Sequence, residues 1–194
     1  MRKLLFLDRI GDIVALPLAC RHELADALTV RTVVEDSHFP AQRGRARELA
    51  LVLSGIARVY VETADGRDVT QYFARAEDFV IADLDSARGQ LDRIEAITEV
   101  QYAGLPLHVF EGLLARYPAL AVFLGAYYNE AALRARERQE RRARSEAVDT
   151  YADFLQSHPG LETQVPTAHL ASYLGLSTSE FMRARQKYRQ RGIM

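Results

Sequence analysis

The stretch that most constrains this chain lies between residues 165 and 191, near its C-terminal end. Pro166 suits a helix start, where its missing N–H is not needed, and Gly175 suits a helix end because glycine tolerates the left-handed conformation. Ser177 followed by Glu180 predicts the capping box of a second helix. Two short helices joined by a glycine turn are typical of a DNA-reading helix-turn-helix. An ordinary helical hairpin with a solvated basic face is the alternative.

The second of these helices is predicted to have an apolar inner face and a cationic outer one. Phe181 and Tyr188 are seven residues apart, so they share one face of a helix. Arg183 lies one turn past the capped start, where a side chain can reach base edges in the major groove. Its guanidinium group can donate two hydrogen bonds to the O6 and N7 atoms of guanine. The basic residues expected on the outer surface are Arg183, Arg185, Lys187, Arg189 and Arg191.

Composition excludes several classes of protein. With 194 residues, 48% of them hydrophobic and 26% charged, the chain is an ordinary globular protein of one large domain or two small ones. The net charge of −1 leaves nucleic acid open as a partner, because six arginines gather in residues 134–144 beside two glutamates. The single cysteine, Cys20, excludes an intramolecular disulfide. Charges at Asp8, Arg9 and Asp12 argue against a signal peptide or a membrane span, so we expect a cytoplasmic protein with no membrane partner.

Strand signals fill the first half of the chain after one or two short helices in residues 1–27. Runs rich in β-branched and aromatic residues, with turn signals between them, favour an antiparallel sandwich or barrel. Asp65-Gly66 is a hairpin turn, and Gly55 interrupts the strongest strand signal. The expected strands cover residues 28–34, 48–60, 68–73, 79–84 and 94–104.

Helix signals begin after Pro106. A short amphipathic helix over 107–116 is expected to precede a long one from Ala119 to about Arg144, whose first four turns are apolar. We expect a parallel homodimer in which two copies of the long helix pack as a short coiled coil. The interface residues expected are Leu120, Phe123, Leu124, Tyr127 and Ala131. Packing of this helix on its own barrel is the alternative.

The residues show no catalytic or metal-binding pattern. The five histidines never fall at metal-ligand spacing, which argues against a metal-holding cupin barrel. Gly11 and Gly55 are isolated, so there is no phosphate-binding loop. We therefore expect no catalytic residues, no metal and no enzyme activity.

The order of barrel, long helix and helix-turn-helix resembles the Crp/Fnr family of bacterial transcription regulators. The resemblance rests on LVLSGIARVY (51–60), the Asp65-Gly66 turn, FVIADL (79–84), VFEGLLARYP (109–118), YADFL (151–155) and VPTAHLASYLGLSTSEFMRARQK (165–187). It implies an α+β fold: a cyclic-nucleotide-binding-like antiparallel β-barrel (a double-stranded β-helix), a long dimerisation helix and a C-terminal helix-turn-helix. The corresponding ranges are 1–117, 118–144 and 145–194.

The resemblance also implies a set of DNA contacts. Residues 178–188 would form the recognition helix, which reads bases mainly through Thr178, Ser179 and Arg183. Thr167 matches a residue that contacts the DNA phosphate backbone. Lys187 and Arg189 complete the expected DNA-binding set. Family members usually continue into a two-stranded wing, whereas residues 191–194 imply a truncated one.

The effector site of the family is altered in this sequence. The family has Gly-Glu after a strand and Arg-Ser or Arg-Thr about ten residues later, for the ribose and the cyclic phosphate. Here the first pair is Ala82-Asp83, and the arginine is Arg93 by counting or Arg88 by strand register; neither precedes Ser or Thr. We therefore expect weak or absent binding of cyclic AMP, an effector that the sequence does not identify, and no cofactor.

The function expected is a dimeric, sequence-specific DNA-binding transcription regulator with an effector-sensing barrel. Its partners would be double-stranded DNA, a second copy of the chain, an unidentified small-molecule effector and, by the resemblance, RNA polymerase. The alternative is a small-molecule sensor or scaffold that acts through protein contacts without binding DNA.

Overall fold

The computed structural model describes residues 2–39, 48–81, 92–144 and 146–192. Two helices, α1 (Arg2–Gly11) and α2 (Leu18–Ala27), precede the strands, as expected for residues 1–27. The strands are β1 (Thr29–Val33), β2 (Glu48–Ser54), β3 (Ala57–Glu62), β4 (Asp68–Ala74), β5 (Phe79–Ile81), β6 (Asp92–Ala96) and β7 (Val100–Pro106).

These strands form two antiparallel sheets that face each other. One has the order β1-β7-β2-β5 and the other the order β4-β3-β6. Small and β-branched side chains fill the space between them, among them Ala50, Val52, Val59 and Ala96. The described ladders thus make a two-sheet sandwich. On one side the segment after β1 joins β6, through the His38–Glu95 bridge and the Phe39 N–H that the Ile94 carbonyl accepts at 3.0 Å, but the described strands do not complete the closed barrel that we expected.

Within the described residues, the chain crosses between the sheets three times at the same end: at Gly55 after β2, at residues 75–78 between β4 and β5, and at residues 97–99 between β6 and β7. At Gly55, φ is 89°, and a Cβ there would lie 2.2 Å from the carbonyl oxygen of Glu99. The crossing at residues 97–99 divides the single strand expected over 94–104 into β6 and β7. That expectation was wrong because the apolar pattern continues through Ile97, which is buried although it belongs to neither strand.

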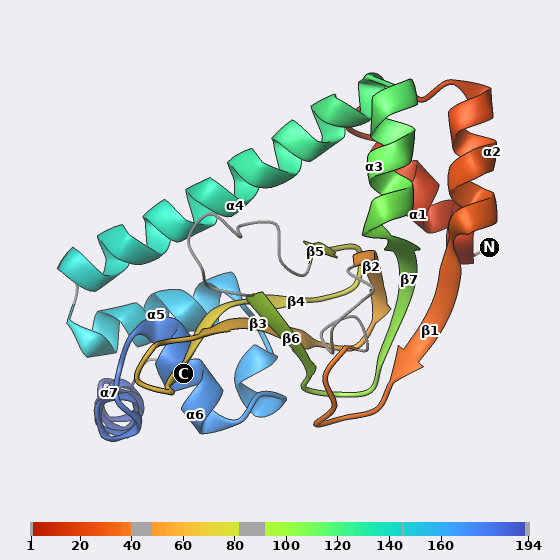
Figure 1. Ribbon diagram of the computed structural model, residues 1–194. Coiled ribbons are helices and arrows are strands. Elements are labelled where there is room, and N and C mark those ends of the chain that lie inside the picture. Colours follow the sequence, from red (N-terminus) through yellow and green to blue (C-terminus); the bar gives the residue numbers. More distant parts are fainter. Residues whose placement is uncertain (1, 40–47, 82–91, 145, 193–194) are drawn as a thin grey trace.

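Helices cover the outer face of the first sheet. The side chains on this face pack with α1, α2, α3 (Leu107–Arg116) and the start of α4 (Ala119–Arg144). Phe6, Leu51, Leu105 and Phe110 are among the buried members of this cluster. Figure 1 shows α4 extending from this helical end along one side of the molecule. Within the described residues, no helix is long and apolar enough to cross a membrane.

The C-terminal helices pack on the second sheet. They are α5 (Ala147–Ser157), a short 3-10 turn (Leu161–Thr163), α6 (Thr167–Leu174) and α7 (Thr178–Gln190). Their core includes three side chains from the sandwich, Ile56, Phe73 and Ile97. Figure 1 shows α6 beside the β3–β4 hairpin and α7 at the outer corner of the molecule.

Candidate nucleic-acid interface

The turn between α6 and α7 forms as its sequence predicts. Gly175 ends α6 with φ at 73°, in the left-handed region. The Ser177 hydroxyl accepts the Glu180 N–H at 3.2 Å, and the Glu180 carboxylate accepts the Ser177 N–H at 2.8 Å. The hydrogen bond from the Ser177 side chain is the main reason that the pKa of Glu180 is lowered. The predicted capping box is therefore confirmed.

Aromatic side chains fix the rotation of α7 about its axis. Phe181 and Ala184 are buried. Tyr151 of α5 lies with its ring centroid 5.4 Å from those of both Phe181 and Tyr188, in edge-to-face contact. Because these contacts hold one face of α7 against α5, they determine which residues point outward.

Two of the five basic residues expected on the outer surface are committed to the domain itself. Arg185 is half-buried and forms an ion pair with Glu162 at 2.9 Å, and Glu162 also accepts the Tyr151 hydroxyl at 2.6 Å. Arg191 forms an ion pair with Asp149 at 3.2 Å. Arg185 therefore lies only partly on the outer surface expected for it, whereas Arg191 stays on that surface, 49% exposed, with a carboxylate partner from α5.

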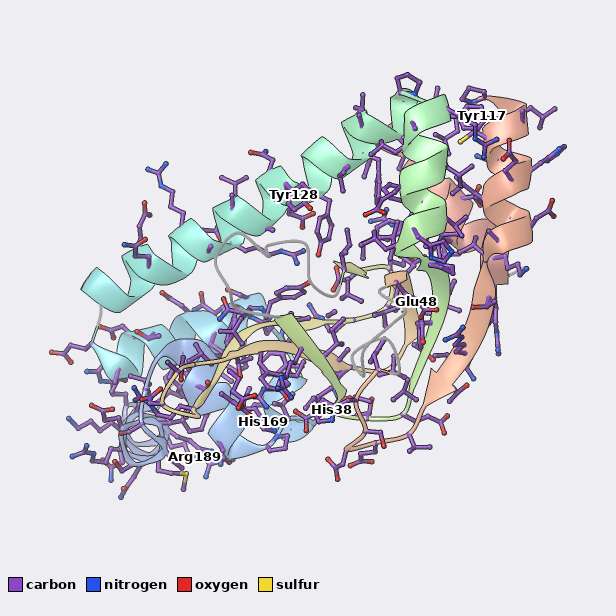
Figure 2. The ribbon with its side chains drawn as sticks, in the orientation of Figure 1. His38, Glu48, Tyr117, Tyr128, His169 and Arg189 are labelled. Carbon is purple, nitrogen blue, oxygen red and sulfur yellow. The ribbon has the colours of Figure 1, made fainter. Side chains whose placement is uncertain are left out.

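The remaining exposed positions make a continuous outer face on α7. Opposite Phe181 and Ala184, the exposed side chains follow the helical spacing i, i+3, i+4, i+7 and i+11. This outer face consists of Ser179, Met182, Arg183, Gln186 and Gln190. Lys187 and Arg189 lie on its two sides and, among the described residues, form no ion pair. Figure 2 labels Arg189 on α7, at the edge of the molecule.

Along this face runs an open hollow. Its walls are Met182, Arg183, Arg185, Gln186, Arg189 and Gln190. Met182 is 48% exposed, the one large apolar side chain of α7 that is not covered. A surface with an amide and a thioether at its centre and cations on both sides can meet base edges and phosphates at once.

The other residues predicted to contact DNA lie at helix starts. Thr178, the first residue of α7, is exposed, and Thr167, the first residue of α6, is half-buried. Sequence reasoning missed Met182 and Gln186, although the inward pair Phe181 and Tyr188 already implied which positions point outward.

The motif is held against β4 by α6. The Ser172 hydroxyl accepts the Thr70 N–H at 3.0 Å and donates to the Asp68 carbonyl at 3.0 Å. The rings of Phe73 and Tyr173 lie 5.4 Å apart. Buried Arg58 lies near this contact, with Glu95 at 3.0 Å and Asp68 at 3.6 Å.

The long helix α4 buries one side of its apolar surface in its own chain. Leu120 and Phe123 are fully buried in the core beneath the first sheet, Leu124 and Tyr127 are half-buried, and Ala131 is exposed. Leu120 and Phe123 are therefore covered without a second copy, which removes them from the surface on which we placed the dimer.

A different stripe of α4 is exposed. It follows the 3-and-4 spacing of a coiled coil at Ala121, Gly125, Tyr128 and Ala132, with Val122 and Leu133 beside it. Val122 is 56% and Leu133 is 51% exposed. We call these six residues the outer stripe of α4; Figure 2 labels Tyr128 on it.

Solved structures resemble this arrangement. FixK2 from Bradyrhizobium japonicum matches at a TM-score of 0.72 with 20% identity, covering 86% of this chain and 86% of that one. A putative transcriptional regulator of the Crp/Fnr family from Eubacterium rectale matches at 0.71 with 18% identity, covering 92% and 86%. The chain has a Crp/Fnr-like fold. The c-di-GMP-responsive regulator CLP from Xanthomonas campestris also matches, at 0.67 with 16% identity, covering 91% and 94%. No protein-family model and no curated protein sequence matches the chain.

The effector site expected of a Crp/Fnr-like fold is only partly described. Ala82, Asp83 and Arg88 lie outside the described residues. Arg93 lies on β6, where its guanidinium forms an ion pair with Glu62 of β3 at 2.6 Å, and both side chains are 47% exposed. Arg93 therefore already has an anionic partner on the sheet surface.

A small cavity lies between α1, the β4–β5 turn and α4. Its volume is about 120 Å³, and its walls include Arg9, Tyr72, Glu77, Asp78, Tyr127 and Arg134. The Tyr127 hydroxyl accepts the Ile81 N–H at 3.2 Å, which ties the end of β5 to α4. In the described residues no group of three or more histidine, cysteine and acidic side chains could hold a metal ion.

Proposed function

We propose that this protein is a dimeric, sequence-specific DNA-binding transcription regulator and not an enzyme. The observation that carries the proposal is the outer face of α7, which is uncovered and flanked by Lys187 and Arg189. The second helix of a helix-turn-helix reads the major groove from such a face.

The rest of the molecule supports the same function. The capping box and the contacts with Tyr151 hold α7 in one orientation, as base recognition requires. The outer stripe of α4 offers a coiled-coil seam for a second copy, and two copies would meet half-sites about one helical turn apart. The two-sheet unit, over residues 1–117, is then the sensing domain, residues 118–144 the dimerisation helix and residues 145–194 the DNA-binding domain.

The test is selection from random double-stranded DNA with the full-length protein, followed by gel-shift measurements at about 50 and 200 mM salt. We expect a near-palindromic sequence to be enriched, and its affinity to fall steeply with salt because phosphate contacts release counterions.

A chain that acts only through protein contacts gives a different result. It enriches no sequence, and its weak binding to DNA is the same for every fragment. That result would leave the sensor or scaffold function, in which α7 carries an ordinary solvated basic face.

A further inference from the structure

The inference concerns which bases the outer face of α7 reads, and it rests on the proposed function. A helix in the major groove turns its central outward residues toward base edges and its flanking residues toward the two phosphate backbones. On α7, Lys187 lies at one side of the outer face, and Arg189 lies at the other side, two turns beyond Met182 along the helix, whereas Met182, Arg183 and Gln186 lie nearer the centre of the face. The charges thus lie where phosphates would be, and the centre holds groups that distinguish bases.

Packing within the domain does not explain why residue 182 is an apolar methionine. Its neighbour Phe181 is fully buried in the domain core, whereas Met182 is 48% exposed and lines the open hollow. Covering such a flexible apolar side chain with an apolar group of a partner removes it from water, which favours binding. In the major groove the apolar feature is the C5 methyl group of thymine.

Gln186 lies one turn beyond Met182 on the same side of the helix and also lines the hollow. A glutamine side chain can donate to N7 and accept from the N6 amino group of adenine at once, which identifies that base. Both residues therefore favour an A·T pair, one through the adenine and the other through the thymine methyl.

We propose that Met182 and Gln186 read an A·T pair in each half-site, with Met182 against the thymine methyl and Gln186 on the adenine. Arg183, the adjacent residue on the outer face, reads a neighbouring guanine. The specificity of the protein is then set by one apolar contact and one amide as well as by its arginine.

The experiment starts from the sequence enriched by the full-length protein. Each thymine of the half-sites is replaced in turn by deoxyuridine, which removes only the C5 methyl group. We expect one thymine position per half-site at which binding weakens about fourfold, or about fifteenfold when both half-sites are changed, the value of a buried methyl-sized group. In Met182→Ala the same replacement has no effect, because the contact is already lost.

Adenine is tested in the same way with 7-deazaadenine, which lacks the N7 acceptor. The wild-type protein loses affinity at the paired position, and Gln186→Ala is insensitive to the replacement. Lys187→Ala is the matched control on the same helix: it weakens binding to every sequence but keeps the wild-type response to both modified bases. Thermal unfolding checks that each variant is folded, as the exposure of these side chains predicts.

Three results would overturn the inference. If no thymine position responds to deoxyuridine, or if Met182→Ala and Gln186→Ala respond as the wild type does, the outer face reads DNA through other residues while the regulator proposal stands. If the wild-type protein enriches no sequence at all, both proposals fail together.

Discussion

The position of Ser177 determines where α7 begins, and therefore which side chains reach the outer face. Its hydroxyl and the Glu180 carboxylate satisfy two N–H groups at the helix start. Such a cap is decided by residues three positions apart, without help from the rest of the fold. For this reason the sequence was sufficient to predict it.

We predict that Ser177→Ala lowers the free energy of unfolding by about 0.5–2 kcal/mol, the usual effect of losing an N-cap. Loss of the hydroxyl also removes the main cause of the lowered pKa of Glu180. That carboxyl stabilises the fold above its unfolded pKa, and its contribution disappears as pH falls through the lower folded pKa. The difference between wild type and variant should therefore shrink in acid.

Denaturant unfolding between neutral and acidic pH measures this effect. Ser157→Ala is the control, because the Ser157 hydroxyl is exposed and donates only to the carbonyl of Asp153 in its own helix. A constant difference between wild type and Ser177→Ala at every pH would show that the carboxylate takes no part in the cap.

Also at the residue scale, we expect two arginines of α7 to have different roles in DNA binding. We predict that Arg183→Ala costs about 1–3 kcal/mol at the enriched sequence and relaxes preference there, since Arg183 lies on the outer face. Arg189→Ala should weaken all sequences alike and reduce the salt slope by about one unit, because it flanks that face. Gel shifts with the enriched and a scrambled sequence measure both; equal small losses for the two variants would contradict the assignment.

Sequence patterns could not predict which basic residues of α7 would form ion pairs within the domain. Arg185 and Arg191 look like the others in the sequence, but their partners, Glu162 and Asp149, come from elements that only the tertiary fold brings near. The same contacts with α5 leave Met182 outside and Phe181 inside.

At the scale of elements, β4 lies between the two helical parts of the molecule. Its Tyr72 ring lies 5.2 Å from the guanidinium carbon of Arg134 on α4, and the ring of the next residue, Phe73, contacts Tyr173 of α6. Adjacent residues of a strand point to opposite faces, so β4 contacts both helices at once. A shift of β4 would therefore move the helix-turn-helix relative to α4.

We predict that Ser172→Ala weakens this contact. Thr70 is 1% exposed, and its N–H would lose the acceptor that the Ser172 hydroxyl provides. A buried donor without a partner costs about 1–3 kcal/mol. Hydrogen exchange of the Thr70 amide and thermal unfolding measure the loss, with Thr163→Ala as control because its exposed hydroxyl bonds only to the nearby Gly160 carbonyl. Unchanged exchange at Thr70 would mean that α6 is held by its aromatic contacts alone.

The sequence predicted the order of the elements better than their ends. Asp65-Gly66 forms the β3–β4 turn with Gly66 at φ 75°, and the long helix begins at Ala119 as expected. Gly55 gave a local sign of the first crossing between sheets. The crossing at residues 97–99 had no such sign, because its conformation depends on the distant contact of Glu99 with Gly55.

At the scale of the whole molecule, the proposed sensing function depends on Arg93, which lies on β6. We predict that cyclic AMP binds weakly or not at all. Arg93 is already paired with Glu62 at 2.6 Å, and losing a phosphate–arginine pair costs on the order of 2–5 kcal/mol. A loss of that size moves a micromolar Kd to about 0.03 mM or weaker. Calorimetry with the full-length protein tests this, and micromolar binding would contradict it.

The face of α4 on which we place a second copy could not be chosen from the sequence. Its first four turns are apolar on several sides, so periodicity alone did not show which side packs on the core of the same chain. Leu120 and Phe123 belong to the intrachain core, whereas Val122 and Leu133 stay exposed. A substitution at Leu124 would therefore disturb both the core and a dimer, because its side chain is half-buried against that core.

Leu133 provides the sharper test. We predict a homodimer through the outer stripe of α4, and Leu133→Glu should make it monomeric, since each copy would lose an apolar side chain that flanks the seam and place a carboxylate beside it. The fold of each copy should be unaffected because Leu133 is 51% exposed and outside the core clusters of described residues. Leu18→Glu is the matched control, a leucine 68% exposed on α2, far along the chain from this stripe.

Sedimentation equilibrium on the order of tens of micromolar protein separates the outcomes, because mass action favours the dimer there. The wild type and Leu18→Glu should sediment at twice the monomer mass, and Leu133→Glu at the monomer mass with an unchanged unfolding transition. Since a monomer meets only one half-site, Leu133→Glu should also lose the preference for a palindrome over a single half-site. A wild-type protein that is monomeric under these conditions, or a Leu133→Glu variant that stays dimeric, would move the interface away from this stripe.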